Sequence, residues 1–537
     1  MIETMERMAA CIVCSTLFVV MTLKTLGVMQ QAGYKNRSFL KWLFKQENML
    51  FNRLCVLALC LALAGTITSL CFSFLGVKTA LLCSAIPFVV LLMGYAYSDN
   101  KLALKVPAVK TERWQRLLAV YGLVVACVSY AVIALLDFLS DLNGSNLYGL
   151  IAYVPFAILP VLLPFLLVLA NAIIAPFEEL RNRKFVKRAG QVLDEKEIIR
   201  VAVVGSYGKT SVKNILKTLL SEKYAVVATP ASYNTPIGVA KTVFSEDFEN
   251  KQLMIVEMGA RKRGDIAELC ALVKPDFAIF TGVCEQHMQT LGSVENAFKE
   301  KSEILKCGAV TVCGEKLKER IELAFEQDYI DECVLYAGES DVSEKDLQAT
   351  KTKFVLRLGE EVLAVETDLL GDAAVENITL AAKLAYECLG LSVEQIASGI
   401  QKLQPIAHRL QLIKSGGAYI LDDGYNCNIA GAKQALEALA RFDKHTCVVT
   451  PGIVEGGVLE EELNARLGEM IFAASVDKVI LVGETLVTAV KKGYVSAGGD
   501  AARVVVVPTL SVAQDVVGAW IAAGDCVLFL NDLPDVY

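Results

Sequence analysis

Long apolar runs dominate the first third of the chain, and shorter β-branched runs separated by amphipathic stretches follow them. Five windows before residue 176 are each about long enough to cross ~30 Å of hydrocarbon as a helix, the third only just. They are residues 8–29, 54–74, 80–97, 117–136 and 147–175. The pattern therefore predicts an N-terminal α-helical membrane domain of about five spans, over residues 1–176.

From about residue 198 the pattern alternates between short strands and helices, which is typical of a parallel sheet covered on both faces. Predicted strands lie at 199–204, 225–228, 253–257, 277–281 and 309–312, with an antiparallel excursion at 354–365 and helices at 375–389 and 393–403. A second set of strands lies at 418–421, 447–450, 478–482, 503–507 and 526–530. We expect a basic juxtamembrane linker at 177–197, a P-loop domain at 198–405 and a Rossmann-like domain at 406–537, with a hinge at 404–408.

Basic residues are distributed unevenly among the predicted connections. Three connections are rich in Lys and Arg: 30–53, 98–116 and the segment after 176; the other two contain only Lys78. The positive-inside rule then predicts a multi-pass protein of a bacterial cytoplasmic membrane, with the N-terminus outside and the domains after residue 176 in the cytoplasm. A cleaved signal peptide is the alternative for the first window, but its flank holds Glu3, Glu6 and only Arg7.

Composition narrows the function classes. Hydrophobic residues make up 54% of the chain and the mean hydropathy is +0.46, too apolar for an ordinary soluble enzyme. A net charge of −7, without a basic tract interleaved with aromatic residues, argues against a nucleic-acid partner. The 16 cysteines are scattered and the chain has 3 histidines, so neither a disulfide framework nor a zinc site is indicated, and Cys11-x-x-Cys14 lies inside an apolar window.

The segment from Gly205 to Ser211, Gly-Ser-Tyr-Gly-Lys-Thr-Ser, lies between a predicted strand and a predicted helix. Successive backbone N–H groups before a helix N-terminus form an anion cradle, Lys209 supplies a mobile cation, and Thr210 supplies a hydroxyl for Mg²⁺. Val203 stands where the strict eight-residue motif has its first glycine. The alternative is a glycine turn without a ligand, but the strand–loop–helix context favours a nucleoside triphosphate.

This loop resembles the Gly-Thr-x-Gly-Lys-Thr loop of the Mur ligases, which are ATP-dependent amide-forming enzymes. Further segments resemble that family in the same order, most closely its members that add D-alanyl-D-alanine: 233–239, 257–260, 285–293, 299–304, Asn377, 408–410 and 421–428. The resemblance covers about residues 199–537, and nothing before residue 199 matches. It implies an acyl phosphate made from ATP and a carboxylate, which an amine then attacks.

The resemblance also implies roles for particular residues. Lys209, Glu257, His287 and Lys301 would be catalytic. Two Mg²⁺ ions would be held by Thr210, Glu257, His287 and a Lys301 carbamylated by CO₂. The ATP-binding set would be Gly205, Ser206, Tyr207, Gly208, Lys209, Thr210, Ser211, Asn377, Arg409 and Asp423, and the substrate neighbours would be Asn234, Thr235, Asn426 and Asn428. The alternative for Glu257, His287 and Lys301 is an ordinary solvated side chain, and the alternative for Asn377 and Asp423 is a capping or turn residue.

Several positions depart from the family pattern. Gly424, Ile429, the pair Ala374-Val375 and the loop 450–457 replace the usual residues, which leaves the acceptor uncertain. The implied function joins D-Ala-D-Ala, or a related amine, to a lipid-linked or UDP-linked muropeptide at a membrane lipid surface, in cell-wall peptidoglycan synthesis. Two alternatives remain: another Mur-type ligase, such as a poly-γ-glutamate synthase-like or amidating enzyme, and a membrane scaffold that binds ATP without ligating.

Overall fold

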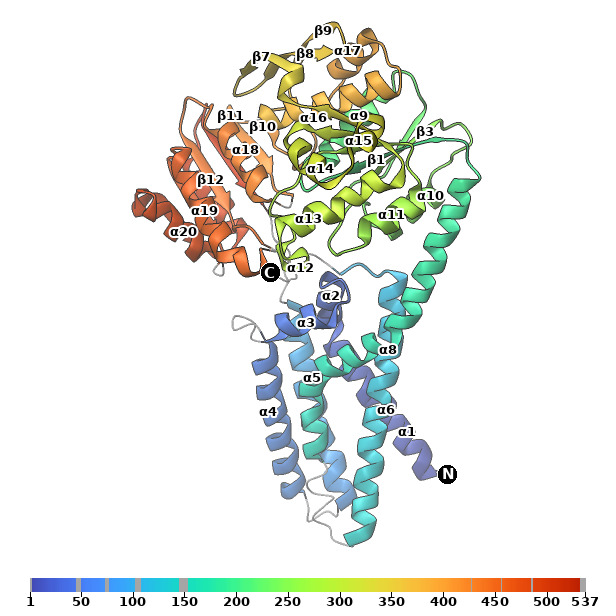
Figure 1. Cartoon of the computed structure of the whole chain (residues 1–537). Coiled ribbons are helices and arrows are strands. Elements are labelled where there is room, and N and C mark those ends of the chain that lie inside the picture. Colours follow the sequence, from blue (N-terminus) through green and yellow to red (C-terminus); the bar gives the residue numbers. More distant parts are fainter. Residues whose placement is uncertain are drawn as a thin grey trace. The chain divides into compact units, whose positions relative to one another are not determined.

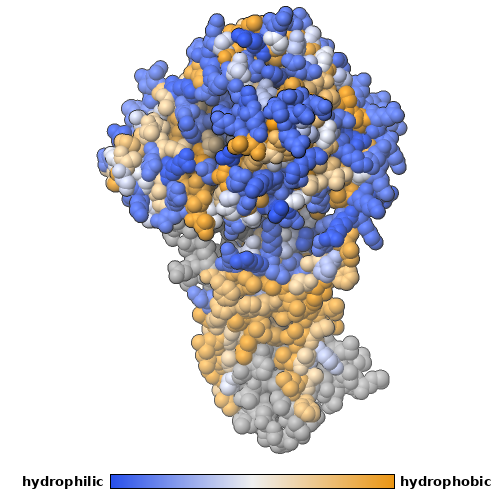
Figure 2. Space-filling model, in the orientation of Figure 1, coloured by the Kyte–Doolittle hydropathy of each residue, from blue (hydrophilic) through white to orange (hydrophobic). Residues whose placement is uncertain are grey.

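A computed structural model describes residues 2–44, 50–72, 77–101, 108–143, 153–425, 427–454, 456–483 and 486–531. The chain forms two compact units, one made mainly of Met1–Arg181 and the other of Asn182–Asp532 (Figure 1). Hydrophobic residues gather over the first unit and hydrophilic residues over the second, on the face drawn in Figure 2. The polarity difference read from the sequence therefore coincides with the division into units.

The first unit is helical. Its helices are α1 (Ile2–Met21), α2 (Leu23–Gln31), α3 (Asn36–Leu43), α4 (Leu50–Cys71), α5 (Val77–Lys101), α6 (Glu112–Asn143) and the first part of α8 (Tyr153–Asp194). Their shared core includes Phe18, Leu61, Tyr121 and Leu163. Cys11 lies in this unit and its Sγ contacts the carbonyl oxygen of Ala126. Among the described residues no group of three or more His, Cys, Asp or Glu side chains could hold a metal.

Length and apolarity support fewer spans than the five predicted. Within the described ranges three helical stretches could cross a membrane: Leu50–Thr68, Glu112–Leu135 and Ala157–Asp194. A fourth span results if Cys11–Met21 and Leu23–Gln31, bent by 48°, count as one. The third predicted window falls in α5, whose apolar stretch Ala85–Ser98 is shorter than the others.

Helix α8 continues through most of the predicted linker, ending at Asp194. Its last turns belong to the second unit, where Ala189 and Leu193 are fully buried in a hydrophobic cluster. The Phe185 ring lies 4.9 Å from that of Phe244. Residues 182–194 are thus a packed part of the α/β unit, which the basic composition of the linker did not indicate.

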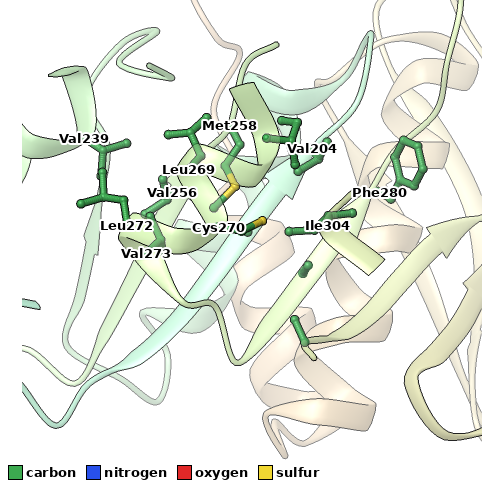
Figure 3. Packing of buried hydrophobic residues seen from close by; sticks show 14 of the residues in the cluster. Val204, Val239, Val256, Met258, Leu269, Cys270, Leu272, Val273, Phe280 and Ile304 are labelled. Atoms are coloured by element: carbon green, nitrogen blue, oxygen red, sulfur yellow. The ribbon is translucent and has the colours of Figure 1, made fainter. Parts of the chain in front are cut away.

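The central sheet has six parallel strands in the order β2-β3-β1-β4-β5-β6. The strands are β1 (Ile199–Val204), β2 (Val226–Ala228), β3 (Leu253–Glu257), β4 (Phe277–Phe280), β5 (Val310–Gly314) and β6 (Val334–Ala337). The connecting helices are α9 (Lys209–Leu220), α10 (Pro236–Ser245), α11 (Asp265–Val273), α12 (Met288–Leu291), α13 (Val294–Lys301), α14 (Lys318–Ala324) and α15 (Gln327–Cys333), with 3-10 turns at Ser302–Cys307 and Glu315–Leu317. Two clusters cover its two faces, and Figure 3 shows one, which includes Val204, Val256, Leu269 and Phe280.

An antiparallel sheet and two helices complete this lobe. The sheet consists of β7 (Val342–Leu347), β8 (Thr352–Leu358) and β9 (Glu361–Thr367), after a 3-10 turn at Glu339–Asp341. Helix α16 (Gly371–Lys383) continues as a π-helical turn, Leu384–Cys388, and α17 (Val393–Gln401) follows. α16 and α17 pack beside α9 on the second face of the central sheet.

The C-terminal lobe contains a six-stranded sheet in the order β10-β11-β15-β12-β13-β14. Only β10 (Gln411–Ser415) is antiparallel, against β11 (Ala418–Asp423); β12 (Thr446–Thr450), β13 (Lys478–Val482), β14 (Val504–Val507) and β15 (Cys526–Leu530) are parallel. Its helices are α18 (Ile429–Leu439), α19 (Glu460–Ala473), α20 (Val487–Ser496) and α21 (Leu510–Trp520), with 3-10 turns at Gly457–Leu459 and Ala501–Arg503. Two successive α/β domains are therefore observed, as predicted.

Candidate active site

The phosphate loop lies between β1 and α9, at the carboxyl edge of the central sheet. Gly208 has a φ of 73°, and a Cβ placed there would lie 2.6 Å from Oδ1 of Asn377. Only glycine satisfies both conditions, because L side chains avoid this conformation and Asn377 leaves no space. Lys209 Nζ donates to the carbonyl oxygen of Gly205, 2.7 Å away. The Asn377 amide therefore lies directly against the loop.

A pocket of about 490 Å³ opens beside this loop. Its lining comes from both lobes of the α/β unit. The central lobe contributes the phosphate loop and Ser232, Asn234, Thr235, Pro236, Glu257, Gly259, Ala260, Arg261, Asp265, Gln286, His287, Leu369, Leu370, Ala373, Ala374, Glu376 and Asn377, and the C-terminal lobe contributes Ile406, Arg409, Leu410, Asp423, Tyr425, Cys427, Asn428, Gly431 and Gln434. The sequence-predicted residues Ser206, Tyr207, Gly208, Lys209, Thr210, Ser211, Asn234, Thr235, Glu257, His287, Asn377, Arg409, Asp423 and Asn428 all line it. Gly205 and Lys301 are not among its lining residues, and Asn426 lies outside the described residues.

Glu257 ends β3 with only 1% of its surface exposed. Its Oε2 accepts from the Thr210 hydroxyl at 2.9 Å and lies 3.3 Å from Lys213 Nζ, while Oε1 accepts from Asn234 Nδ2 at 3.0 Å. Lys213 also donates to the carbonyl oxygen of Ala231. A hydroxyl and a carboxylate on neighbouring elements are ligands that suit Mg²⁺ shared with phosphate oxygens, so these two residues fit such an ion.

Lys213 was not predicted as a site residue. It is 2% exposed, and burial lowers its pKa while the Glu257 carboxylate raises it. An amphipathic helix pattern gives no sign of a lysine on its buried face, and only its position one turn after Lys209 could have drawn attention to it. The structure therefore adds a buried counter-charge to the predicted set.

His287 and Lys301 approach the site from another side. His287 has a φ of 57° at the start of α12 and lines the pocket. Lys301, at the end of α13, is 2% exposed and its Nζ has no hydrogen-bond partner in the described part of the chain. Burial, and secondarily Lys209, lower the pKa of Lys301 to about 8. Burial of an amine without a hydrogen-bond partner lowers the stability of the fold, which argues against the alternative of a solvated lysine on the helix face.

The C-terminal lobe contributes an arginine, a carboxylate and a ring. Arg409 lies 4.3 Å above the ring of Tyr425, and its guanidinium is 3.4 Å from the Thr210 hydroxyl oxygen. Asp423 ends β11 and accepts from the backbone N–H of Leu410 at 3.0 Å. Burial raises the pKa of Asp423 to about 6. Arg409 thus connects the two lobes at the phosphate loop.

Two predicted substrate neighbours have structural roles already. Thr235 caps α10 by accepting from the N–H of Gly238, and Asn428 caps α18 by accepting from the N–H of Gly431. Both still line the pocket. Arg261, which the sequence reading did not single out, lines it as well.

A comparison with protein families matches residues 203–385 to the Mur ligase middle domain. This match agrees with the family resemblance inferred from the motifs. The most similar relatives include UDP-N-acetylmuramoyl-tripeptide–D-alanyl-D-alanine ligases (MurF). The one from Bacillus subtilis (strain 168) is 30% identical over 296 residues, 53% of this chain and 62% of that protein, and the one from Escherichia coli (strain K12) is 27% identical over 295 residues, 53% of this chain and 64% of that protein. The chain thus spans about three fifths of the length of these relatives.

Solved structures show the same fold. MurF from Thermotoga maritima in complex with ADP has a TM-score of 0.57 at 23% identity, covering 65% of this chain and 80% of that one. Folylpolyglutamate synthase from Mycobacterium tuberculosis, complexed with ADP and AMPPCP, has a TM-score of 0.51 at 18% identity, covering 67% and 95%. The arrangement of a central domain followed by a C-terminal α/β domain is therefore the Mur ligase fold.

Proposed function

We propose that this protein is an ATP-dependent, ADP-forming amide ligase that activates a carboxylate as an acyl phosphate. One observation carries the proposal: the buried Glu257 carboxylate is bonded to the Thr210 hydroxyl of the phosphate loop, at the floor of a pocket walled by both lobes. A site that only held nucleotide would not need Asn234, Arg261 and His287 in its lining as well. The names of the two curated relatives reported above, both ligases, support the same class.

The reaction brings two anions together, because a carboxylate attacks the γ-phosphorus of ATP. Lys209 and Arg409 supply positive charge at the phosphate loop, and the loop's backbone N–H groups stabilise charge that develops on the phosphoryl oxygens. Asn377 is proposed for the adenine side and Asp423 for the ribose hydroxyls, and both line the pocket. Closure of the C-terminal lobe, with segment 404–408 as the hinge, would exclude water from the acyl phosphate. An amine then attacks the acyl carbon and phosphate leaves.

Magnesium binding follows from the same residues. Thr210 and Glu257 would hold one ion, which neutralises the transferring phosphoryl group when bound. His287 and Lys301 are proposed for a second ion, after Lys301 reacts with CO₂ to form a carbamate. The unpartnered, buried amine of Lys301 supports this assignment, because an amine that is partly neutral near pH 8 is a nucleophile for CO₂.

The substrates are proposed from the relatives and from the N-terminal unit. The amine is D-Ala-D-Ala or a related dipeptide, and the carboxylate belongs to a muropeptide carried by UDP or by a lipid. The apolar helices support a position in a bacterial cytoplasmic membrane. The distribution of basic residues supports an outside N-terminus and an α/β unit in the cytoplasm. A lipid-linked carboxylate would suit an enzyme anchored in that way.

The test is turnover by the full-length protein in detergent, with ATP, D-Ala-D-Ala and either the soluble UDP-N-acetylmuramoyl tripeptide or its lipid-linked form. ADP release and product mass are measured together. Turnover of the lipid-linked form supports the complete proposal, and turnover of only the soluble form removes the lipid part. Replacing D-Ala-D-Ala by glutamate or ammonia identifies a different Mur-type ligase if only those amines react.

Substitution of Lys301 separates a ligase from an ATP-binding scaffold. Lys301→Met removes a buried, unpartnered amine, so the melting temperature should stay unchanged or rise. Ligase activity should fall by at least about 100-fold, because the variant cannot form the carbamate proposed as a ligand of the second ion. Nucleotide binding, measured by the ADP-induced thermal shift, is the control and should persist. Unchanged ligase turnover in Lys301→Met would contradict the proposed role.

A further inference from the structure

One cation in the lining of the pocket has no part in the proposed chemistry. Among the Lys and Arg side chains that line the pocket, Lys209 contacts Gly205, Arg409 contacts Thr210 and Tyr425, and Arg261 is the third. Within the described ranges, the Arg261 guanidinium has no hydrogen-bond or ion-pair partner; only its backbone N–H is bonded. An exposed, uncommitted guanidinium in an active-site wall is available to a ligand.

The backbone that carries Arg261 is held firmly. The N–H groups of Arg261 and Lys262 both donate to Asp265 Oδ2 at 2.9 Å. The N–H groups of Gly264 and Ile266 donate to the buried Glu300 carboxylate at 2.7 and 2.8 Å. These four bonds fix a loop of irregular backbone, so the Arg261 side chain projects from a rigid base and less freedom is lost on binding.

The loop that carries Arg261 is also bonded to Asn234, which contacts Glu257. Gly259 donates to the carbonyl oxygen of Asn234 at 2.8 Å, and a Cβ on Gly259 would lie 2.8 Å from Asn234 Cγ. Asn234 in turn donates to Glu257. Arg261 therefore follows Glu257 by four residues on a segment that cannot shift without disturbing the predicted magnesium ligand.

Two other side chains in the pocket lining indicate which chemical groups the ligand has. The Asp265 carboxylate is occupied by the two backbone N–H groups and lies 4.0 Å from Lys262 Nζ, so it does not neutralise Arg261. Gln286 also lines the pocket, and its Oε1 is buried with no partner among the described residues. A cation and an unpaired acceptor together match a carboxylate beside an N–H donor, which is the chemistry of a peptide.

We propose that Arg261 binds a peptide carboxylate of the acyl substrate. The inference rests on the proposed ligase function and names the residue that would recognise its carboxylate substrate. Arg263, two residues along the same loop and exposed but absent from the pocket wall, is the matched control. Arg261 is a binding residue, so its loss should change KM for the carboxylate substrate and leave kcat little changed.

The experiment compares full-length wild type, Arg261→Ala, Arg261→Lys and Arg263→Ala in detergent, with UDP-N-acetylmuramoyl tripeptide as the probe. Arg261→Ala should raise KM for the probe by about 10- to 100-fold, the range for a lost charge-assisted hydrogen bond. Arg261→Lys should recover part of the loss, and Arg263→Ala should stay within about twofold of wild type. Raising the salt concentration should increase KM of the wild type and hardly affect Arg261→Ala.

Two further measurements distinguish the possible failures. The ADP-induced thermal shift tests nucleotide binding alone, so its absence in the wild type counts against the proposed function. Direct binding of N-acetylmuramoyl tripeptide, which lacks the diphosphate, tests the ligand class. Equal weakening of both probes by Arg261→Ala supports the carboxylate assignment. If Arg261→Ala weakens only the UDP-linked probe, Arg261 binds the diphosphate and the inference is wrong. The inference is also wrong if Arg261→Ala has the wild-type KM for the UDP-linked probe and the wild-type affinity for the N-acetylmuramoyl tripeptide.

Discussion

At the scale of single residues, Gly208 is held by two constraints at once. Its φ of 73° disfavours any side chain, and a Cβ would collide with Oδ1 of Asn377. Gly208→Ala should therefore abolish nucleotide binding and destabilise the fold by about 1–3 kcal/mol. The measurement is the melting temperature with and without ADP. Gly308→Ala is the control, because Gly308 has a φ of 83° but open space around its Cα, so only the strain should remain and ADP should still bind.

Asp423 gives a pH-dependent prediction at the same scale. Burial raises its pKa in the folded protein from 3.8 to about 6. Between these values the folded state binds more protons than the unfolded state, so the stability contribution of this group falls as pH rises from about 4 to 6. Asp423→Asn cannot ionise and should lose this dependence. Chemical unfolding at several pH values checks it, and parallel pH curves for the two proteins would contradict it.

The proposed binding of ribose hydroxyls by Asp423 should have the opposite pH dependence. A carboxylate accepts ribose hydroxyls best when it is ionised, so the affinity for ADP should weaken below about pH 6 in the wild type. Comparison with Asp423→Asn at the same pH values removes the contribution of phosphate protonation. Ionisation of Asp423 would then lower the free energy of unfolding above pH 6 and raise the affinity for nucleotide at the same time.

At the scale of elements, the end of α8 is an integral part of the α/β unit. Leu193 is fully buried, and Asp194 forms an ion pair with Lys274 at 2.8 Å. Leu193→Ala should lower the free energy of unfolding of this unit by about 2–4 kcal/mol, the usual result for a buried leucine. Lys187→Ala, on the exposed face of the same helix, should change it by less than about 0.5 kcal/mol. Urea unfolding of the full-length protein in detergent measures both, and equal effects would show that the last turns of α8 do not support the core.

Elements with strong patterns were predictable, and those without were not. The strands 199–204, 253–257, 478–482 and 526–530 agree with the structure in both ends, because each is a compact β-branched or apolar run. β7 was missed since Ser343, Glu344, Lys345 and Asp346 give it no apolar alternation. β6 and β10 were missed because they are only four and five residues long, which is too short for a pattern of apolar and polar positions to stand out.

The site residues also divide into those that the sequence could predict and those that it could not. Residues in ordered motifs, such as Lys209, Glu257 and Asn377, could be placed because the motif fixes both the element and its end. Lys213 and Arg261 could not, because one owes its importance to burial beside Glu257 and the other to a backbone anchored by Glu300, 36 residues or more away in sequence. Such relations arise only in the folded chain.

At the scale of the whole molecule, the topology is testable without knowledge of the substrate. The distribution of basic residues predicts that Lys110 is cytoplasmic and Asn143 lies outside. Fusion of alkaline phosphatase after Asn143 should give an active reporter, and fusion after Lys110 an inactive one. A green fluorescent protein at the C-terminus should fluoresce, since it folds in the cytoplasm. The reverse pattern would contradict a cytoplasmic ATP site.

The two-walled pocket has a consequence for how the α/β unit melts. Each lobe has its own sheet and its own buried cluster, so calorimetry of the ligand-free protein is expected to resolve two overlapping peaks. A compound that reaches from Asn234 to the residues near Gln434 would contact both lobes and couple their unfolding. Merging of the peaks into one would then identify compounds that bridge the lobes, before any enzymatic assay exists.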